Sequence, residues 1–300
     1  MVHGILNVEK EIGFTSFDVV AKLRGILKQK KIGHTGTLDP DARGVLPVCL
    51  GNATKLCDML TEKTKEYEAV MLLGVTTDTL DLSGEVLKEQ PVSVSEEEIR
   101  GIINGFWGEQ QQIPPMYSAL KVDGRRLYEL AREGKTIERK SRTITIHRIE
   151  IVSVELPRVT FRVECSKGTY IRSLCQDIGE KVGCGACMES LIRTRSGAFT
   201  IENALTLSTI EQMMKSGRIE DAILPMEAIF EKLEALHVTE QWKVRIDNGN
   251  PLELLAFEET ITPEEKKQYR IYNVEGRFFA IYRYEEEQNR MMPERIFPLE

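Results

Sequence analysis

Residues 33–55, GHTGTLDPDARGVLPVCLGNATK, hold four Gly and two Pro, although the segments on either side have plain helix and strand patterns. Pro40 disfavours the helical region for the residue before it, so we expect Asp39 to lie in extended backbone. Glycines at 36 and 44 allow sharp turns or a close approach to a ligand. A rigid loop that presents one carboxylate suits a nucleophile, although a plain turn beside a buried strand is the ordinary alternative.

The segments around this loop carry regular patterns. Before it, apolar residues at helical spacing predict a helix that is capped by Thr15 or Ser16 and ends near Gln29. After it, Asn52 or Thr54 is placed to cap a short helix. We therefore expect the loop to connect two regular elements.

Further along the chain, alternation over residues 65–74 predicts a strand that buries Tyr67, and residues 143–165 contain two more strand-like runs. Helical spacing then resumes with Arg172 in the first turn. A cation in that position opposes the helix macrodipole, at a cost of roughly 0.3–1 kcal/mol. The conflict indicates an anionic partner for Arg172.

Charge is distributed unevenly along the chain. Residues 1–200 hold 28 Lys and Arg against 27 Asp and Glu, whereas residues 201–300 hold 12 against 20, and the net charge is −7. Basic side chains gather at 22–31 and 125–142. Because local patches rather than total charge set phosphate binding, the acidic total is compatible with an RNA partner.

Other classes of protein are disfavoured. No apolar run reaches the roughly 18 residues that span a bilayer, and the first residues lack a signal-peptide pattern, so we expect a cytoplasmic protein. Cys184 and Cys187 form a single CxxC pair, which is a weak signal for zinc or redox chemistry. Asp78 and Asp81 lie in an acidic loop without the EF-hand ligand pattern, and we interpret it as a turn-rich connection.

The segment around Asp39 closely resembles the catalytic motif of the TruB-type pseudouridine synthases, which make pseudouridine at position 55 of tRNA. In that family the Asp of the GxLDPxAxGxL pattern is the essential catalytic residue. Residues 168–172 match a second family motif, G-x-Y-[IV]-R. The resemblance therefore implies that Asp39 is catalytic, that Arg172 pairs with it as a catalytic residue, and that Tyr170 approaches the target nucleotide.

Three further roles follow from the same resemblance. Tyr67 matches the Tyr of the family's K-x-Y-x-A strand, which packs against the target base and which we count among the catalytic residues. Leu191 aligns with an apolar residue that lines the uracil pocket, and His34 is expected to fill the space that the flipped base leaves. On the residues alone, its strand position favours an ordinary core aromatic for Tyr67, and His34 is as readily an ordinary loop residue.

Residues 110–142 resemble the thumb-like insertion of stand-alone bacterial family members, which grips the tRNA T-arm. Lys121 and Arg132 are the basic residues expected to bind substrate there; on composition alone the segment is a solvated surface hairpin. One departure precedes the central loop, where Glu11 replaces the proline of the family's K-P-x-G-x-T-S entry. The residues that carry the insertion match are Pro114, Pro115, Tyr117, Ser118, Ala119, Lys121, Val122, Gly124, Tyr128, Ala131, Arg132 and Gly134.

The resemblance covers residues 4–200 closely and the last 70 loosely, and it implies an α+β fold. A catalytic domain at 1–228 would form around a mixed, mostly antiparallel twisted sheet. Residues 229–300 would form a small PUA-like β domain that binds RNA. The resemblance implies no cofactor and no metal, and we expect a monomer that needs no protein partner and contacts no membrane.

The expected mechanism rests on the Asp39 carboxylate, with Arg172 lowering its pKa and so keeping it ionised. Two alternatives remain open. One is an RNA chaperone that remodels the tRNA arm without chemistry, which would not need the carboxylate. The other is the guide-dependent relative that modifies rRNA, which lacks an insertion such as 110–142.

Overall fold

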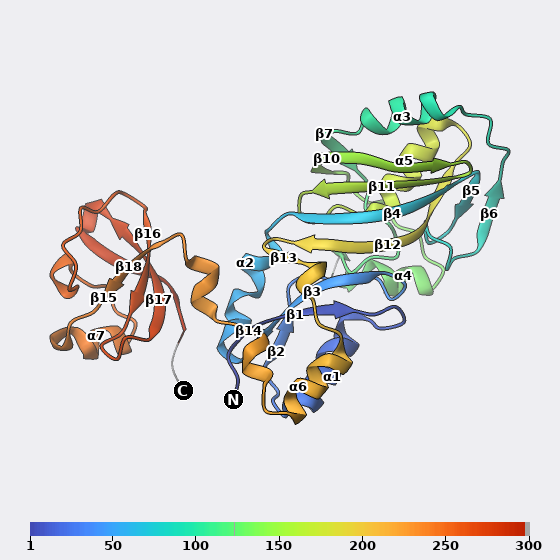
Figure 1. Cartoon of the computed structure of the whole chain (residues 1–300). Helices are drawn as coiled ribbons and strands as arrows, with labels where there is room; N and C mark the ends of the chain where they lie inside the picture. The colour runs from blue at the N-terminus through green and yellow to red at the C-terminus, as the bar shows by residue number, and fades with distance from the viewer. Residues whose placement is uncertain (123, 298–300) are drawn as a thin grey trace.

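The computed structural model describes residues 1–122 and 124–297, and its largest element is a ten-stranded sheet (Figure 1). Across the sheet, the strands are β14 (Ile223–Leu224), β1 (Gly4–Lys10), β3 (Arg43–Leu50), β12 (Ala186–Ser196), β4 (Lys65–Leu73), β11 (Arg158–Cys165), β10 (Arg142–Glu155) and β7 (Gly108–Gln112), with β2 (Ile32–His34) beside β3 and β13 (Phe199–Thr200) beside β12. All neighbours are antiparallel except β3 and β12. The predicted mixed, mostly antiparallel sheet is confirmed.

Helix α1 (Ser16–Leu27) begins where its capping residue predicts. The backbone N–H of Asp18 donates to Thr15 Oγ1 at 3.0 Å, and the Asp18 carboxylate accepts from the Thr15 N–H at 2.9 Å. The helix ends at Leu27 rather than near Gln29, because Lys28 adopts a left-handed conformation with φ 51°. With α6 (Leu207–Lys215), it buries its apolar face against β1 and β3.

Helices α3 (Glu96–Asn104) and α5 (Ile171–Val182) cover the other half of the sheet. Their apolar side chains, such as Ile103 and Ile178, share one core with the inward residues of β4, β10 and β11. Helix α5 follows the loop after β11, so its first turn lies close to the end of that strand. This position places Arg172 within reach of the loop that precedes β3.

The predicted cap at Asn52 or Thr54 is wrong. A 3₁₀ helix, η1 (Gly51–Leu56), and helix α2 (Cys57–Thr61) follow β3, and neither begins with a side-chain cap bond. Asn52 Oδ1 instead accepts from Lys31 Nζ at 2.7 Å. Composition favoured a capped α-helix, but the chain leaves the strand directly into tight 3₁₀ turns.

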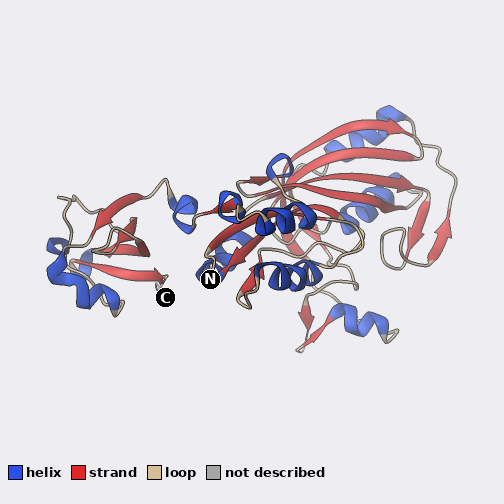
Figure 2. Ribbon diagram, turned by 60° about the horizontal axis from the view of Figure 1, so that its bottom comes forward, coloured by secondary structure: helices blue, strands red, loops and turns tan. Residues whose placement is uncertain are grey.

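Two small strand pairs project from the sheet. One, β5 (Val75–Thr77) with β6 (Val86–Glu89), connects β4 to α3 and carries the acidic loop. The other, β8 (Lys121–Val122) with β9 (Arg125–Arg126), is followed by α4 (Leu127–Arg132) and stands out from the body (Figure 2).

This second projection is shorter than the predicted insertion 110–142. Residues 110–112 belong to β7, which pairs with the start of β10 at Arg142. The segment outside the sheet is therefore 113–141. That this segment grips tRNA stays a prediction.

The C-terminal part forms a separate four-stranded sheet of β15 (Glu234–His237), β16 (Gln268–Tyr272), β17 (Phe278–Glu285) and β18 (Arg290–Ile296), with the short helix α7 (Lys243–Asp247) (Figure 1). Phe230 packs on Phe278 and Phe297 in a cluster that also contains Ile5 and Val45 of the large sheet. The domain boundary between 228 and 229 and the PUA-like assignment stay predictions. No helix in the described part of the chain is long and apolar enough to cross a membrane.

Candidate active site

The loop that carries Asp39 is tied to the elements beside it. The backbone N–H of Leu38 donates to Ser16 Oγ at 2.9 Å, at the first residue of α1. The ammonium of Lys10, a fully buried side chain on β1, donates to the carbonyl oxygen of Pro40 at 3.1 Å. Burial lowers the pKa of Lys10 to about 8. The backbone on both sides of Asp39 is therefore anchored to α1 and β1.

The guanidinium of Arg172 joins this loop to two other segments. One of its nitrogens lies 3.0 Å from Asp39 Oδ2, and the other lies 3.6 Å from Asp81 Oδ2. It also donates to the carbonyl oxygens of Thr79 at 3.0 Å and Tyr117 at 2.8 Å. The side chain of Arg172 is only 6% exposed, so it is the buried centre of a network that reaches the acidic loop and the projecting segment.

Arg172 lowers the pKa of Asp39 as predicted, but a larger effect of burial, which the sequence did not predict, outweighs it. Burial raises the pKa of Asp39 above its ordinary value; the cations Arg172 and Lys10 oppose this, and the neighbouring Asp81 carboxylate adds to it. The residue types indicated the cation beside the carboxyl group but not how much water the fold removes from it. The Asp39 side chain keeps 36% exposure, toward the cavity described next.

A cavity of about 360 Å³ opens in front of Asp39. Tyr67 from β4, Leu191 from the adjacent strand β12, and Tyr170 from the residue before α5 line it together with Arg172. Strict alternation along β4 buries Tyr67, and this burial raises the pKa of its phenol. The cavity thus combines the Asp39 carboxylate with several cationic side chains, Arg172 among them, and with apolar or aromatic walls.

Gln112 holds the backbone of Tyr170, and Arg142 contacts its ring. Gln112 on β7 donates from Nε2 to the Tyr170 carbonyl oxygen at 3.0 Å and accepts the Tyr170 N–H at 2.8 Å. The guanidinium of Arg142 lies 4.8 Å from the centre of the Tyr170 ring. The ring is therefore positioned at the cavity wall before any ligand arrives.

Three of the predicted substrate-binding residues do not line this cavity. His34, half-buried at the end of β2, accepts the Gly36 N–H at Nδ1 over 3.3 Å, and burial lowers the pKa of its ring. Lys121 and Arg132 are exposed on the projecting segment. Their contact with substrate stays a prediction.

The sequence interpretation missed several residues at the site, among them two buried cations and one carboxylate. Asp81 was assigned to a turn-rich connection, yet it contacts Arg172; its spacing from Asp78 gave no sign of this. Lys65 and Arg193 line the cavity, and both are almost fully buried cations. The signal was a Lys at the start of an apolar strand and an Arg inside another. Because a buried charge is costly unless it has partners, both positions indicated a specific polar environment.

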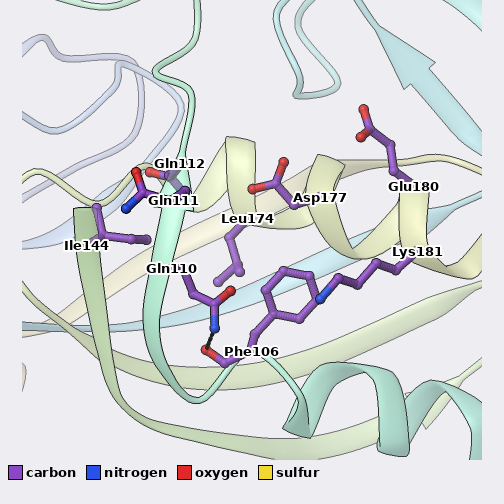
Figure 3. A pocket seen from close by; sticks show the side chains of 9 residues that line it. All are labelled: Phe106, Gln110, Gln111, Gln112, Ile144, Leu174, Asp177, Glu180 and Lys181. Carbon is purple, nitrogen blue, oxygen red and sulfur yellow. Dashed lines mark hydrogen bonds between the residues drawn. The ribbon is translucent and has the colours of Figure 1, made fainter. Parts of the chain in front are cut away.

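A second hollow of about 390 Å³ lies against α5, β7 and β10 (Figure 3). Its walls include Asp177, whose pKa is raised to about 6 by burial and by Glu180, and Lys181, whose ammonium lies 4.2 Å from the centre of the Phe106 ring. It shares no lining residue with the Asp39 cavity. We therefore do not include it in the candidate active site.

Within residues 1–122 and 124–297, no three His, Cys, Asp or Glu side chains gather as a metal site requires. The cysteines at 184 and 187 are both buried, reduced thiols.

Two protein-family models match the chain. The model described as "TruB family pseudouridylate synthase (N terminal domain)" matches residues 24–171, and the model described as "tRNA pseudouridylate synthase B C-terminal domain" matches residues 172–231. The boundary between the two matches lies inside the first turn of α5.

Curated relatives match over almost the whole chain. A protein named tRNA pseudouridine synthase B from Lachnoclostridium phytofermentans is 51% identical, covering 99% of this chain and 100% of the relative. One of the same name from Clostridium novyi is 47% identical, covering 93% and 95%.

Solved structures share the fold. A chain of the "Crystal Structure of a Cbf5-Nop10-Gar1 Complex" superposes with a TM-score of 0.73 at 30% identity, covering 99% of this chain and 85% of that one. A chain of the "Structure of H/ACA RNP bound to a substrate RNA containing 2'-deoxyuridine" gives a TM-score of 0.71 at 28% identity, covering 99% and 86%.

Proposed function

The chain belongs to the TruB family of pseudouridylate synthases, and from this premise we propose that it isomerises uridine to pseudouridine at position 55 in the T-loop of tRNA. The observation that carries the proposal is the Asp39 carboxylate, 3.0 Å from Arg172, facing a cavity walled by Tyr67, Tyr170 and Leu191. Such a cavity offers one anion and flat apolar surface, which suits a single extruded pyrimidine.

The reaction breaks the bond between ribose C1′ and uracil N1, turns the base, and joins C1′ to C5. A proton leaves C5 and N1 gains one, so no group is lost and nothing is oxidised. The step therefore needs no redox cofactor. Asp39 is the group that carries the chemistry, and Arg172 holds its carboxylate in place.

The target uridine lies inside a folded RNA arm, so it must leave its stack before it reaches Asp39. Extrusion costs about a few kcal/mol. Stacking on an aromatic side chain returns about 1–3 kcal/mol per base. Tyr67 supplies that surface in the cavity, and Leu191 on the adjacent strand β12 adds apolar surface to it.

The remaining RNA contacts are assigned to exposed basic groups. Lys121 and Arg132 lie on the projecting segment 113–141, and they would meet the phosphates of the T-arm. The C-terminal sheet is the proposed second RNA contact. We place the enzyme in the cytoplasm as a monomer without an obligatory protein partner. Light scattering of the purified protein would test the monomeric state.

The experiment that tests the function uses an unmodified tRNA transcript and maps pseudouridine by position. We expect pseudouridine at position 55, and none when that uridine is replaced by cytidine. Product at another position would refute the site assignment, and no product at all would refute the reaction.

Neither alternative is favoured. A pure RNA chaperone has no use for a buried carboxylate and guanidinium facing a cavity. The relatives named tRNA pseudouridine synthase B reach 51% identity, whereas the chain in the Cbf5-Nop10-Gar1 complex reaches 30%. A tRNA substrate therefore has more support than a guide-dependent one.

His34 is predicted to act through its shape rather than through proton transfer. Burial lowers the pKa of its ring and so favours the neutral form. His34→Phe keeps a flat ring that can stack in the space left by the flipped base, and we expect it to lose less activity than His34→Ala. Single-turnover modification of tRNA would measure both, and equal losses would contradict the stacking role.

A further inference from the structure

Arg193 is a buried cation without a carboxylate partner among the residues that the structure describes. It lies on β12, its side chain is 1% exposed, and no Asp or Glu oxygen of the described chain lies within ion-pair distance of it. Burying an unpaired charge is costly, and an apolar residue would fill a strand interior more cheaply. The hydrogen bonds of this guanidinium therefore give the reason that a cation lies at this position.

The partners of Arg193 are backbone carbonyl oxygens on both sides of Asp39. Its Nε donates to Val45 at 2.6 Å, while its two terminal nitrogens donate to Gly36 at 3.2 Å and Thr37 at 3.4 Å. The planar guanidinium presents its donors in a fixed fork, which an ammonium cannot reproduce. One side chain thus ties the entrance of the catalytic loop to its exit.

The backbone of the loop also lies directly against β12. Arg193 is the parallel register partner of Gly44, and a Cβ at position 44 would lie 2.3 Å from the Arg193 carbonyl oxygen. With φ at +118°, position 44 favours glycine for a second reason. This close approach holds the loop exit at the depth where Arg193 can reach it.

On its other side, Arg193 is the register partner of Tyr67 on β4, and both side chains line the cavity with Asp39. Arg193 therefore stands between the loop that carries the carboxylate and the aromatic wall. Its hydrogen bonds go to backbone oxygens of the loop on either side of Asp39 and not to the Asp39 carboxylate itself.

We propose that Arg193 is a positioning residue that fixes the catalytic loop so that the Asp39 carboxylate keeps its place beside Arg172 and Tyr67. This inference rests on the proposed isomerase function. Because a shift of about 1 Å at a reacting group can cost roughly a hundredfold in rate, loosening this clamp should reduce the chemical step far more than RNA binding.

The test compares Arg193→Lys and Arg193→Gln with Arg195→Lys, using single-turnover isomerisation and tRNA affinity. Arg195 is a matched control on the same strand; it contacts Glu164 at 2.7 Å and does not line the cavity. For both Arg193 variants, we expect a fall in rate on the order of a hundredfold with near wild-type affinity. Arg195→Lys should keep the wild-type rate.

A pH profile separates positioning from a purely structural role. If the loop loosens, Asp39 moves from Arg172 and loses the cation that opposes the effect of burial, so the acid limb of the rate should move to higher pH. Wild-type rate and pH profile in folded Arg193 variants would overturn the proposal, as would equal losses in Arg195→Lys or failure of both Arg193 variants to fold. An inactive wild-type protein would refute the isomerase function instead.

Discussion

We expect Asp39→Asn to lose pseudouridine formation while tRNA binding stays close to the wild-type level. The amide has nearly the same shape as the carboxylate but is neither an anion nor a useful nucleophile. Removal of the residue that carries the chemistry typically costs on the order of a thousandfold or more in rate. Arg172 still has Asp81 as a charge partner at 3.6 Å, so the network should keep its fold.

The measurement is single-turnover isomerisation of an unmodified tRNA transcript, with filter binding for affinity. Asp41→Asn is the matched control, because Asp41 is an exposed residue on the same loop. Wild-type speed in Asp39→Asn would remove Asp39 from the mechanism. A protein that only remodels tRNA would show no difference between the two variants.

Replacing Arg172 by Met lowers the rate by on the order of a hundredfold and moves its acid limb to higher pH. In the proposed mechanism, activity requires ionised Asp39, and this form is present above the pKa of the folded state and is lost as the pH falls through it. Burial already raises that pKa, and Arg172 is the largest opposing influence. Without Arg172 the pKa rises further, so activity is lost at a higher pH than in the wild type.

Two variants give this prediction its controls. Asp81→Asn should move the acid limb in the opposite direction, because the Asp81 charge raises the pKa of Asp39. Arg162→Met removes an exposed guanidinium 2.8 Å from Glu68 and should leave the profile unchanged. An acid limb that stays in place in Arg172→Met would contradict the assigned electrostatics.

Motif residues close to one another in the sequence were the easiest part of the site to predict. Asp39 with the proline after it, and Tyr170 with Arg172, lie in short contiguous motifs that can be recognised without knowing the rest of the fold. Alternation likewise placed Tyr67 on the buried face of β4. The burial of Tyr67 follows from alternation over a few residues, whereas the roles of Asp39, Tyr170 and Arg172 were implied by the family resemblance.

The missed features depend on contacts across the fold. Val45 is 148 positions from Arg193, and only the parallel pairing of β3 and β12 brings them together. Asp81 meets Arg172 because the loop between β5 and β6, which also bridges to Met188 of β12, contacts the Arg172 guanidinium. The pKa of Asp39 follows from how much solvent the assembled structure removes, and residue types do not report that quantity.

The C-terminal sheet and the catalytic loop are connected through one strand. Val45 gives its side chain to the apolar cluster beneath Phe230, Phe278 and Phe297, and it gives its carbonyl oxygen to Arg193. Val45 thus belongs both to the apolar contact between the two sheets and to the hydrogen bonds that hold the loop. A packing change in that cluster would therefore act on the backbone oxygen that Arg193 holds.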